Sequence, residues 1–467
     1  MNLRSWVGVG GGVLLSAFSG LTAPPTVVLT HALRTGNAYQ LEWSSSPADF
    51  QFTVETRENL TAAQWQPVPG VTWPITNTTV LLPNSALVDS FFRIRAVPNP
   101  ANRGAVVAVT QTATLPAFQI QLLLGLQGIT SITPRNGVRF YQVRYETVDA
   151  HGFKTQASGG LAVPDVAGGA FPLISYQHGT VTQREDVPSR LNTEGFLGAV
   201  LASLGYVATL PDYLGLGDSP GIHPYHHAES EATATIDLLR AARTWCSSNS
   251  VSLNTKLFLT GYSEGGHATL AAMRAIEARH TNEFKLTAVV GGAGAYDLAG
   301  ITSDEILQKS PSPNPYYLAY LLNAYVDVYG LASSLSDLFV APYAATVPPL
   351  LDGTHDSTAI NSALPTIAAN MLRPEYFDDF KLRPDHPLRV ALRANSLIEW
   401  TPRAPLRLYH CAGDKDVPPG NTQIAYDSFV ARGATQVERF DPLPAANHSG
   451  CVEPTLLAAL AWFESLR

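Results

Sequence analysis

The chain has 467 residues, of which 45% are hydrophobic and 15% are charged, and its formal net charge at pH 7 is -8. This length allows two or three domains, and the hydrophobic content supports a substantial core. The acidic balance leaves no basic footprint, which argues against a nucleic-acid partner. Beyond the N-terminus no segment is apolar enough to span a bilayer.

The first 23 residues have the pattern of a secretory signal peptide. Arg4 precedes an apolar stretch of about 15 residues, and small residues follow it as far as Ala23. The glycines from Gly8 to Gly12 argue against a strand or a membrane anchor. We therefore expect residues 1–23 to be a signal peptide and the protein to be secreted, periplasmic or bound at the cell surface.

Residues 26–98 have the pattern of short strands and turns, without a helical segment between them. β-branched and aromatic residues gather between breaks rich in Asn, Pro, Ser and Gly, at 39–43, 50–57, 78–83 and 91–97. This spacing predicts a small all-β sandwich, and the stretch resembles the fibronectin type III-like modules attached to secreted bacterial enzymes. It could serve surface attachment or spacing, or it could pack passively against the next domain.

From residue 105 onward, strand and helix patterns alternate, which predicts an α/β fold with a mainly parallel sheet and right-handed crossovers. A hairpin is expected over 138–152 and 154–164. Further strands are expected at 171–176, 205–210, 256–259, 286–298, 406–410 and 436–440, and helices at 118–127, 195–204, 228–246 and 454–466.

About a hundred residues, 300–404, contribute no obvious strand to this sheet. The segment 316–330 within them is helical in pattern and strongly apolar or aromatic. So long an insertion between neighbouring strands is typical of a lid whose Tyr, Leu and Phe side chains could line an acyl pocket. The alternative is a separate helical packing layer.

Residues 261–265 read Gly-Tyr-Ser-Glu-Gly, the G-x-S-x-G pattern. A short apolar strand precedes it, and good helix formers follow as far as Ala278. Strand, tight turn and helix are the context of a nucleophile elbow, in which Ser263 stands exposed above the sheet. The alternative for Ser263 is a serine in an ordinary Gly-rich turn.

In this arrangement a carboxylate and then a histidine must follow the serine along the chain. Two aspartates follow the strand at 406–410. We select Asp416, which precedes Val417-Pro418-Pro419, as the acid, and expect Asp414 to shape the turn. His448 is the one histidine after Asp416, so it is the predicted base.

An oxyanion hole needs two backbone N–H donors. The residue after the nucleophile, Glu264, supplies one of them at the start of its helix. The loop after an early strand should supply the second, and Thr180 follows such a strand in His178-Gly179-Thr180.

Together, SYQHGT, LPDYLGLGDSPGIHPYHHAESEA, GYSEGGH, HCAGDKDVPP and NHSGC resemble secreted bacterial α/β-hydrolases related to the secretory lipase family. The resemblance covers residues 105–467, and five motifs agree in order. It implies an α/β-hydrolase fold with a lid and hydrolysis of a carboxylic ester. We expect a small-molecule or lipid ester as substrate, contact with a lipid interface or surface, and no cofactor. Ser263, Asp416 and His448 would then be nucleophile, acid and base.

Histidines and cysteines outside this set invite separate hypotheses. His223, His226 and His227 lie close in sequence, but no carboxylate spacing completes a metal site, so we expect a loop at the pocket mouth and no metal. Cys411 and Cys451 lie within a few residues of the acid and the base, on loops that must converge, which predicts a disulfide between them.

Two other functions are compatible with parts of the pattern. A serine peptidase of the same fold would use the same three residues. A non-catalytic surface-binding protein would act through the β-sandwich, although an intact Ser-Asp-His set argues against it.

Overall fold

The structure is a computed structural model, which describes residues 26–35, 38–46, 50–57, 66–68, 77–83, 91–98 and 103–467. The chain separates into two compact units, Met1–Ala101 with His151–Lys154 and Asn102–Ala150 with Thr155–Arg467. The predicted signal peptide, residues 1–23, lies outside the described residues. Within the described ranges, no helix has both the length and the apolar character needed to cross a membrane.

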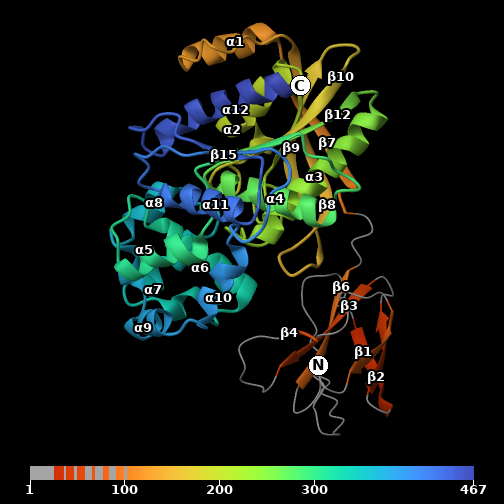
Figure 1. The fold of residues 1–467 in the computed structure, drawn as a ribbon, viewed down its shortest axis with the longest axis vertical. Helices are drawn as coiled ribbons and strands as arrows, with labels where there is room; N and C mark the ends of the chain where they lie inside the picture. Colours follow the sequence, from red (N-terminus) through yellow and green to blue (C-terminus); the bar gives the residue numbers. More distant parts are fainter. Residues whose placement is uncertain are drawn as a thin grey trace. The chain divides into compact units, whose positions relative to one another are not determined.

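The N-terminal unit contains two three-stranded sheets, of order β1-β2-β5 and β4-β3-β6 (Figure 1). Side chains of both sheets meet in one apolar cluster, in which Trp43 and Phe52 lie edge to face with ring centroids 5.4 Å apart. The fibronectin type III-like assignment of this unit stays a prediction. The strands are β1 (Thr26–Thr35), β2 (Ala38–Ser46), β3 (Phe50–Arg57), β4 (Gln66–Pro67), β5 (Thr79–Pro83) and β6 (Phe91–Pro98).

The second unit is built on a mixed nine-stranded sheet of order β15-β14-β13-β12-β10-β11-β9-β8-β7. From β15 to β11 every pairing is parallel, whereas β9 pairs with β11 and β7 with β8 antiparallel. The strands are β7 (Val106–Leu115), β8 (Gly137–Val148), β9 (Lys154–Asp165), β10 (Ala170–Gln177), β11 (Val207–Pro211), β12 (Ser252–Tyr262), β13 (Ala288–Gly292), β14 (Leu406–Tyr409) and β15 (Val437–Phe440).

Helices cover both faces of this sheet (Figure 1). Along β12, Leu257 and Leu259 pack into the apolar cluster that contains residues of α3, α4 and α11, whereas Phe258 packs into the one that contains residues of α1, α2 and α12. Alternate side chains thus reach opposite layers. The helices are α1 (Ala117–Leu126), α2 (Thr193–Ser203), α3 (Ala228–Ser248), α4 (Glu264–Arg279), α11 (Gly420–Ala431) and α12 (Val452–Leu466).

The chain between β13 and β14 forms a helical insert, residues 298–395, drawn in green-blue in Figure 1. Its buried side chains, among them Tyr325, Phe339 and Phe380, form an apolar cluster separate from the two beside the sheet. The insert is therefore a packed body with its own core. Its helices are α5 (Ser303–Gln308), α6 (Tyr316–Tyr329), α7 (Tyr343–Thr346), α8 (Ser357–Ser362), α9 (Pro374–Leu382) and α10 (Pro387–Asn395).

The expected strands differ from the structure most at β13 and β7. β13 is shorter than the predicted 286–298, because the chain turns out of the sheet at Ala293, which has a φ of 42°. β7 is present although the sequence analysis expects no strand at these residues. Most of its side chains are exposed, so the strand carries no alternation of apolar and polar residues that could reveal it.

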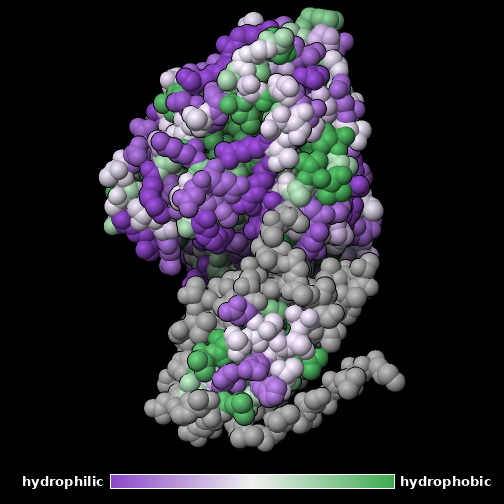
Figure 2. Space-filling model, turned by 90° about the vertical axis from the view of Figure 1, so that its right-hand side faces the viewer, coloured by the Kyte–Doolittle hydropathy of each residue, from purple (hydrophilic) through white to green (hydrophobic). Residues whose placement is uncertain are grey.

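Hydrophobic residues gather in patches on the face of the molecule drawn in Figure 2. In the second unit, α1 carries some of the most exposed apolar side chains among the described residues. Phe118 is 69%, Leu122 61% and Leu126 76% exposed. One side of this helix is therefore apolar and open to solvent.

Candidate active site

Ser263 stands at a sharp turn between β12 and α4. Its backbone has φ 59° and ψ -123°, a strained conformation for a residue with a side chain. A Cβ atom at Gly261 would lie 2.3 Å from the Gly265 carbonyl oxygen, and one at Gly265 would lie 1.9 Å from the Gln177 carbonyl oxygen. Both glycines of the G-x-S-x-G pattern are therefore required by backbone crowding at the turn.

His448 lies beside this serine, in the loop that leads into α12. Its Nε2 is 2.8 Å from Ser263 Oγ, and the hydroxyl of Tyr262 donates a 2.8 Å hydrogen bond to its backbone oxygen. Both Ser263 and His448 are 8% exposed. The structure thus brings together two residues that lie 185 positions apart in sequence, as the order of motifs predicts.

The carboxylate that meets His448 belongs to Asp414, so the prediction of Asp416 is corrected. Asp414 Oδ2 is 2.6 Å from His448 Nδ1 and 3.2 Å from His410 Nε2. Its Oδ1 accepts the backbone N–H groups of Asp416 and Val417 at 2.9 and 3.0 Å. One oxygen shapes the turn, as expected, while the other remains for the histidine.

Asp416 points instead toward the helical insert. Its Oδ1 accepts a 2.7 Å hydrogen bond from Asn314 Nδ2, and both residues line a pocket that also contains Ser263. Asp416 is therefore a pocket residue, two positions beyond the carboxylate that orients the histidine.

Hydrogen bonds hold Asp414 in its charged form. Burial by itself would raise the pKa of this carboxyl, but the hydrogen bonds from His410 and His448 outweigh it and hold the pKa well below its usual value. With Asp414 charged, Nδ1 of His448 carries the proton of the shared hydrogen bond, and Nε2 is left to accept the Ser263 hydroxyl proton.

The acid and base loops are joined covalently. Cys411 and Cys451 form the predicted disulfide, with their Cα atoms 6.0 Å apart, and Cys246 is a buried free thiol. Since Cys411 precedes Asp414 by three residues and Cys451 follows His448 by three, the bond links the two loops close to the interacting side chains.

The loop after β10 approaches the serine from the opposite side. A Cβ atom at Gly179 would lie 3.9 Å from Ser263 Cβ. Glu194 fixes this loop, because its Oε1 accepts the Gly179 N–H at 3.2 Å and its Oε2 accepts the Tyr176 hydroxyl at 2.5 Å. Thr180 is next in the chain, and its Oγ1 is 3.1 Å from the hydroxyl of Tyr225. Sequence reasoning did not identify Glu194.

Two further carboxylate–histidine pairs are buried behind the nucleophile. Glu264 Oε1 is 2.6 Å from His223 Nε2, and His223 Nδ1 is 2.9 Å from the Leu214 oxygen. Burial lowers the pKa of His223, but the charge and hydrogen bond of Glu264 outweigh burial, so the pKa is raised overall. Glu231 Oε2 is 2.6 Å from His267 Nδ1 in the second pair. The sequence could not reveal these pairs, because their members lie on separate elements.

An apolar pocket reaches Ser263 from beneath the insert. It mixes residues of the insert with residues of the loops at the sheet edge, and its apolar wall includes Tyr225, Leu298, Ile306, Tyr317, Leu321 and Val417. Such a lining suits the hydrocarbon part of a substrate whose polar group lies at the serine.

Two groups of described residues have ligand atoms within 4.8 Å of one another and could hold a metal ion. One, Asp414, Asp416 and His448, overlaps the candidate active site. The other is His226, Glu231 and His267. The expectation that no carboxylate accompanies these histidines is thus corrected for His226, because Glu231 and His267 reach it from two different helices.

Comparison with known proteins places this chain among hydrolases. A family model described as secretory lipase matches residues 189–334, a stretch that contains Ser263 but neither Asp414 nor His448. Comparison with curated proteins gave no match.

Solved structures extend the similarity. The rice cell wall degrading esterase LipA from Xanthomonas oryzae is 31% identical, with a TM-score of 0.67 over 78% of this chain and 96% of that one. A candidate hydrolase from Legionella pneumophila is 28% identical, with a TM-score of 0.72 over 77% of this chain and 98% of that one. Candida antarctica lipase A, 15% identical with a TM-score of 0.58 over 78% of this chain and 82% of that one, shares the fold.

Proposed function

This chain belongs to the α/β-hydrolases related to the secretory lipases, and we propose that it is a secreted serine carboxylic-ester hydrolase. The observation that carries the proposal is the unbroken line of hydrogen bonds from Ser263 through His448 to Asp414. A serine hydroxyl becomes a strong nucleophile only when a base can take its proton, and that geometry supports such a transfer.

The reaction follows from the order of these contacts. His448 Nε2 takes the Ser263 proton as Oγ attacks the ester carbonyl carbon, and Asp414 stabilises the imidazolium that forms. His448 then gives the proton to the departing alkoxide, which leaves as the alcohol and an acyl-serine remains. His448 then takes a proton from a water molecule whose oxygen attacks the acyl carbon, and it returns this proton to Ser263 Oγ as the carboxylic acid leaves.

Negative charge develops on the carbonyl oxygen in each half of the reaction. We assign its stabilisation to the backbone N–H groups of Glu264 and Thr180. Glu264 is the first residue of α4, where the helix has unpaired N–H groups and a positive dipole end. Thr180 follows Gly179, which lies against Ser263. Donors fixed in advance need no reorganisation, and losing one costs about 3 kcal/mol.

The helical insert is proposed to act as a lid over the acyl pocket. Its separate apolar core supports movement as one body, and its α6 side chains Tyr317 and Leu321 line the pocket that reaches Ser263. The exposed apolar side of α1 supports contact with a lipid interface. The family supports export, in agreement with the signal peptide predicted at residues 1–23.

The test combines activity with covalent labelling. The wild-type chain should hydrolyse p-nitrophenyl esters, with a rate that depends on acyl length, and should react once with a fluorophosphonate at Ser263. Ser263→Ala should lose both while its circular dichroism is unchanged, and Ser428→Ala, a serine on α11, should keep both. Cleavage of peptide anilides in preference to esters would favour a peptidase, and absence of labelling in the wild type would favour a binding protein.

A further inference from the structure

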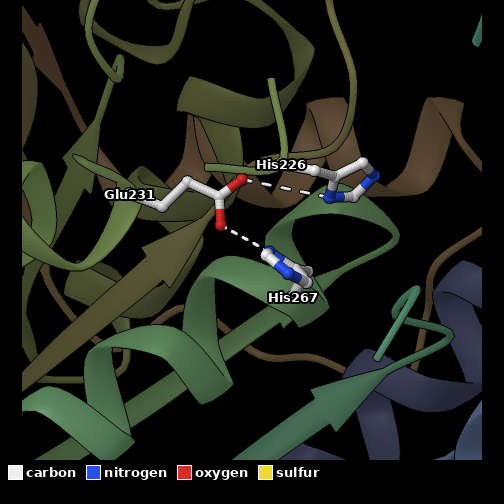
Figure 3. A group of neighbouring side chains, drawn as sticks. All are labelled: His226, Glu231 and His267. Carbon is white, nitrogen blue, oxygen red and sulfur yellow. Dashed lines mark hydrogen bonds and ion pairs between the residues drawn. The ribbon is translucent and has the colours of Figure 1, made fainter. Parts of the chain in front are cut away.

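Three side chains behind the nucleophile elbow point toward one another (Figure 3). His226 comes from the loop before α3, Glu231 from α3 and His267 from α4. Figure 3 shows the Glu231 carboxylate between the two imidazoles, with one oxygen directed to each. The distances are 2.6 Å from Oε2 to His267 Nδ1 and 4.0 Å from Oε1 to His226 Nδ1.

Some polar atoms of this cluster have hydrogen-bond partners in the protein, and others have none. Glu231 Oε1 and His226 Nδ1 are both buried and have no hydrogen-bond partner, although Glu231 is 1% and His226 6% exposed. An unpartnered buried polar atom costs about 1–3 kcal/mol, so two that face each other call for an explanation. Their separation of 4.0 Å is too long for a direct hydrogen bond.

The other ring nitrogen of His267, Nε2, already has a hydrogen-bond partner. Its Nε2 is 2.9 Å from the backbone oxygen of Asn395, which can only accept, so Nε2 carries a proton. Nδ1 therefore either carries a second proton, as an imidazolium paired with Glu231, or presents a lone pair. A backbone carbonyl behind one ring nitrogen is the usual support for a histidine that binds a metal through the other.

We propose that His226 Nδ1, Glu231 and His267 Nδ1 bind a divalent transition-metal ion of the zinc type. Two imidazoles and one carboxylate are a ligand set that zinc uses in proteins, and they leave a fourth tetrahedral position for water. Zinc–ligand bonds are about 2.0–2.2 Å long, so the ligand atoms of a tetrahedral site lie roughly 3.5 Å apart. The three ligand atoms lie within 4.8 Å of one another, so small side-chain shifts would suffice.

His226 lines the pocket that reaches Ser263, which gives an ion a path to the buried site. Bound there, the ion would join the loop before α3 to α3 and α4, and α4 begins at the residue after Ser263.

This site is independent of the proposed ester hydrolysis and is tested by metal binding. The full-length chain, stripped with a chelator and dialysed, would be titrated with ZnCl2 in a calorimeter, and its melting temperature measured with and without zinc. Wild type should bind one ion tightly and melt at a higher temperature with zinc. His226→Ala, which removes a ligand without breaking a hydrogen bond of that ring nitrogen, should weaken zinc binding at least about 100-fold and lose the thermal shift.

The matched control addresses the second group of ligand atoms. Asp416→Asn removes a carboxylate from the Asp414, Asp416 and His448 group and should keep full zinc affinity. Co²⁺ added to the stripped wild type should give the visible absorption bands of a tetrahedral ion, and these should be missing in His226→Ala. Binding that survives in His226→Ala and is lost in Asp416→Asn would overturn the proposal, as would a wild type that shows no thermal shift with zinc. If His226→Ala fails to fold, His226→Gln replaces it with the same expected outcomes.

Discussion

Two kinds of carboxylate–histidine pair flank Ser263, and only one of them has the contacts that the proposed reaction needs. On the open side, His448 has Asp414 at one nitrogen and the reactive hydroxyl at the other. On the buried side, His223 and His267 each have a glutamate at one nitrogen and a backbone carbonyl at the other. The residue types are nearly the same, so the difference lies in the second partner.

A backbone carbonyl can never give up a proton, whereas a serine hydroxyl can. His223 and His267 are therefore held in one orientation by an acceptor at each ring nitrogen, which suits support of the elbow or, at His267, the binding of an ion. In the proposed reaction, His448 passes from neutral to charged and back within one turnover, because its Nε2 partner changes. Proximity of an acid to a histidine is thus insufficient to identify a catalytic pair.

The largest effect should come from exchanging the acid. Asp414→Asn would place an amide N–H opposite His448 Nδ1 and favour the wrong tautomer, so kcat should fall about 10⁴-fold. Asp416→Asn should lower kcat less than about tenfold, since its carboxylate contacts Asn314 rather than the histidine. Steady-state kinetics on one ester compare the two. A larger loss of kcat in Asp416→Asn than in Asp414→Asn would instead assign the role of the acid to Asp416.

On the buried side the expected loss is of stability. His223→Phe would leave the Glu264 carboxylate, whose side chain is wholly buried, without its partner. Breaking such a pair costs about 3–5 kcal/mol in the free energy of unfolding. Urea denaturation measures it, with His355→Phe, at a partly exposed histidine, as the control. If His223→Phe instead kept full stability and lost activity as completely as Asp414→Asn, the buried pair would belong to the catalytic machinery.

Removing the disulfide tests how firmly the open side is held. The double variant Cys411→Ala/Cys451→Ala opens a loop of 40 residues, and the loss of that constraint on the unfolded chain should lower stability by about 4 kcal/mol. Thermal unfolding without reductant is the measurement. Cys246→Ala, which removes only a free thiol, should cost less, and an equal loss in both would mean that the cross-link contributes little.

The smallest expected effect is a pH dependence at Glu305, a pocket residue on α5. Burial raises its pKa to about 7. Because the folded-state pKa exceeds the unfolded value of 4.5, the native state binds the extra proton, and stability declines as the pH rises from about 4.5 through 7. Glu305→Gln should remove about 1 kcal/mol of this decline, given partial solvent screening. Denaturation at pH 5 and pH 8 measures the difference, and equal slopes for variant and wild type would contradict it.

Much of the second unit could be predicted because its strands are buried on both faces. Continuous apolar runs such as Leu257–Leu259 and 171–176 reveal such strands directly. β7 lies at the edge of the sheet with mostly exposed side chains and contains no such apolar run, so the sequence analysis does not predict it. The long insert was evident as a gap between strand patterns, but its six helices and separate core depend on packing that a periodic pattern does not encode.

The residues of the candidate site also differ in how readily the sequence predicts them. Ser263 and His448 were predictable because topology fixes their order and few residues compete for each position. The acid was not, because Asp414 and Asp416 are two residues apart and differ only in where their oxygens point. Expecting Asp414 to shape its turn was correct, yet this does not exclude a role at His448, because a carboxylate has two oxygens. Glu194, Glu231 and His223 act through contacts between distant segments.

Gly265 has no side chain, and this limits which substitutions the segment around Ser263 can accept. Its Cα lies so close to the Gln177 carbonyl that even a methyl group would force β10 and the elbow apart. Those two segments carry the two proposed oxyanion donors. The distance between the donors is therefore limited by a contact between backbone atoms, which a change of side-chain rotamer cannot relax. This backbone contact therefore fixes the spacing of the two proposed donors, whereas the side chains of the insert that line the pocket are not part of it.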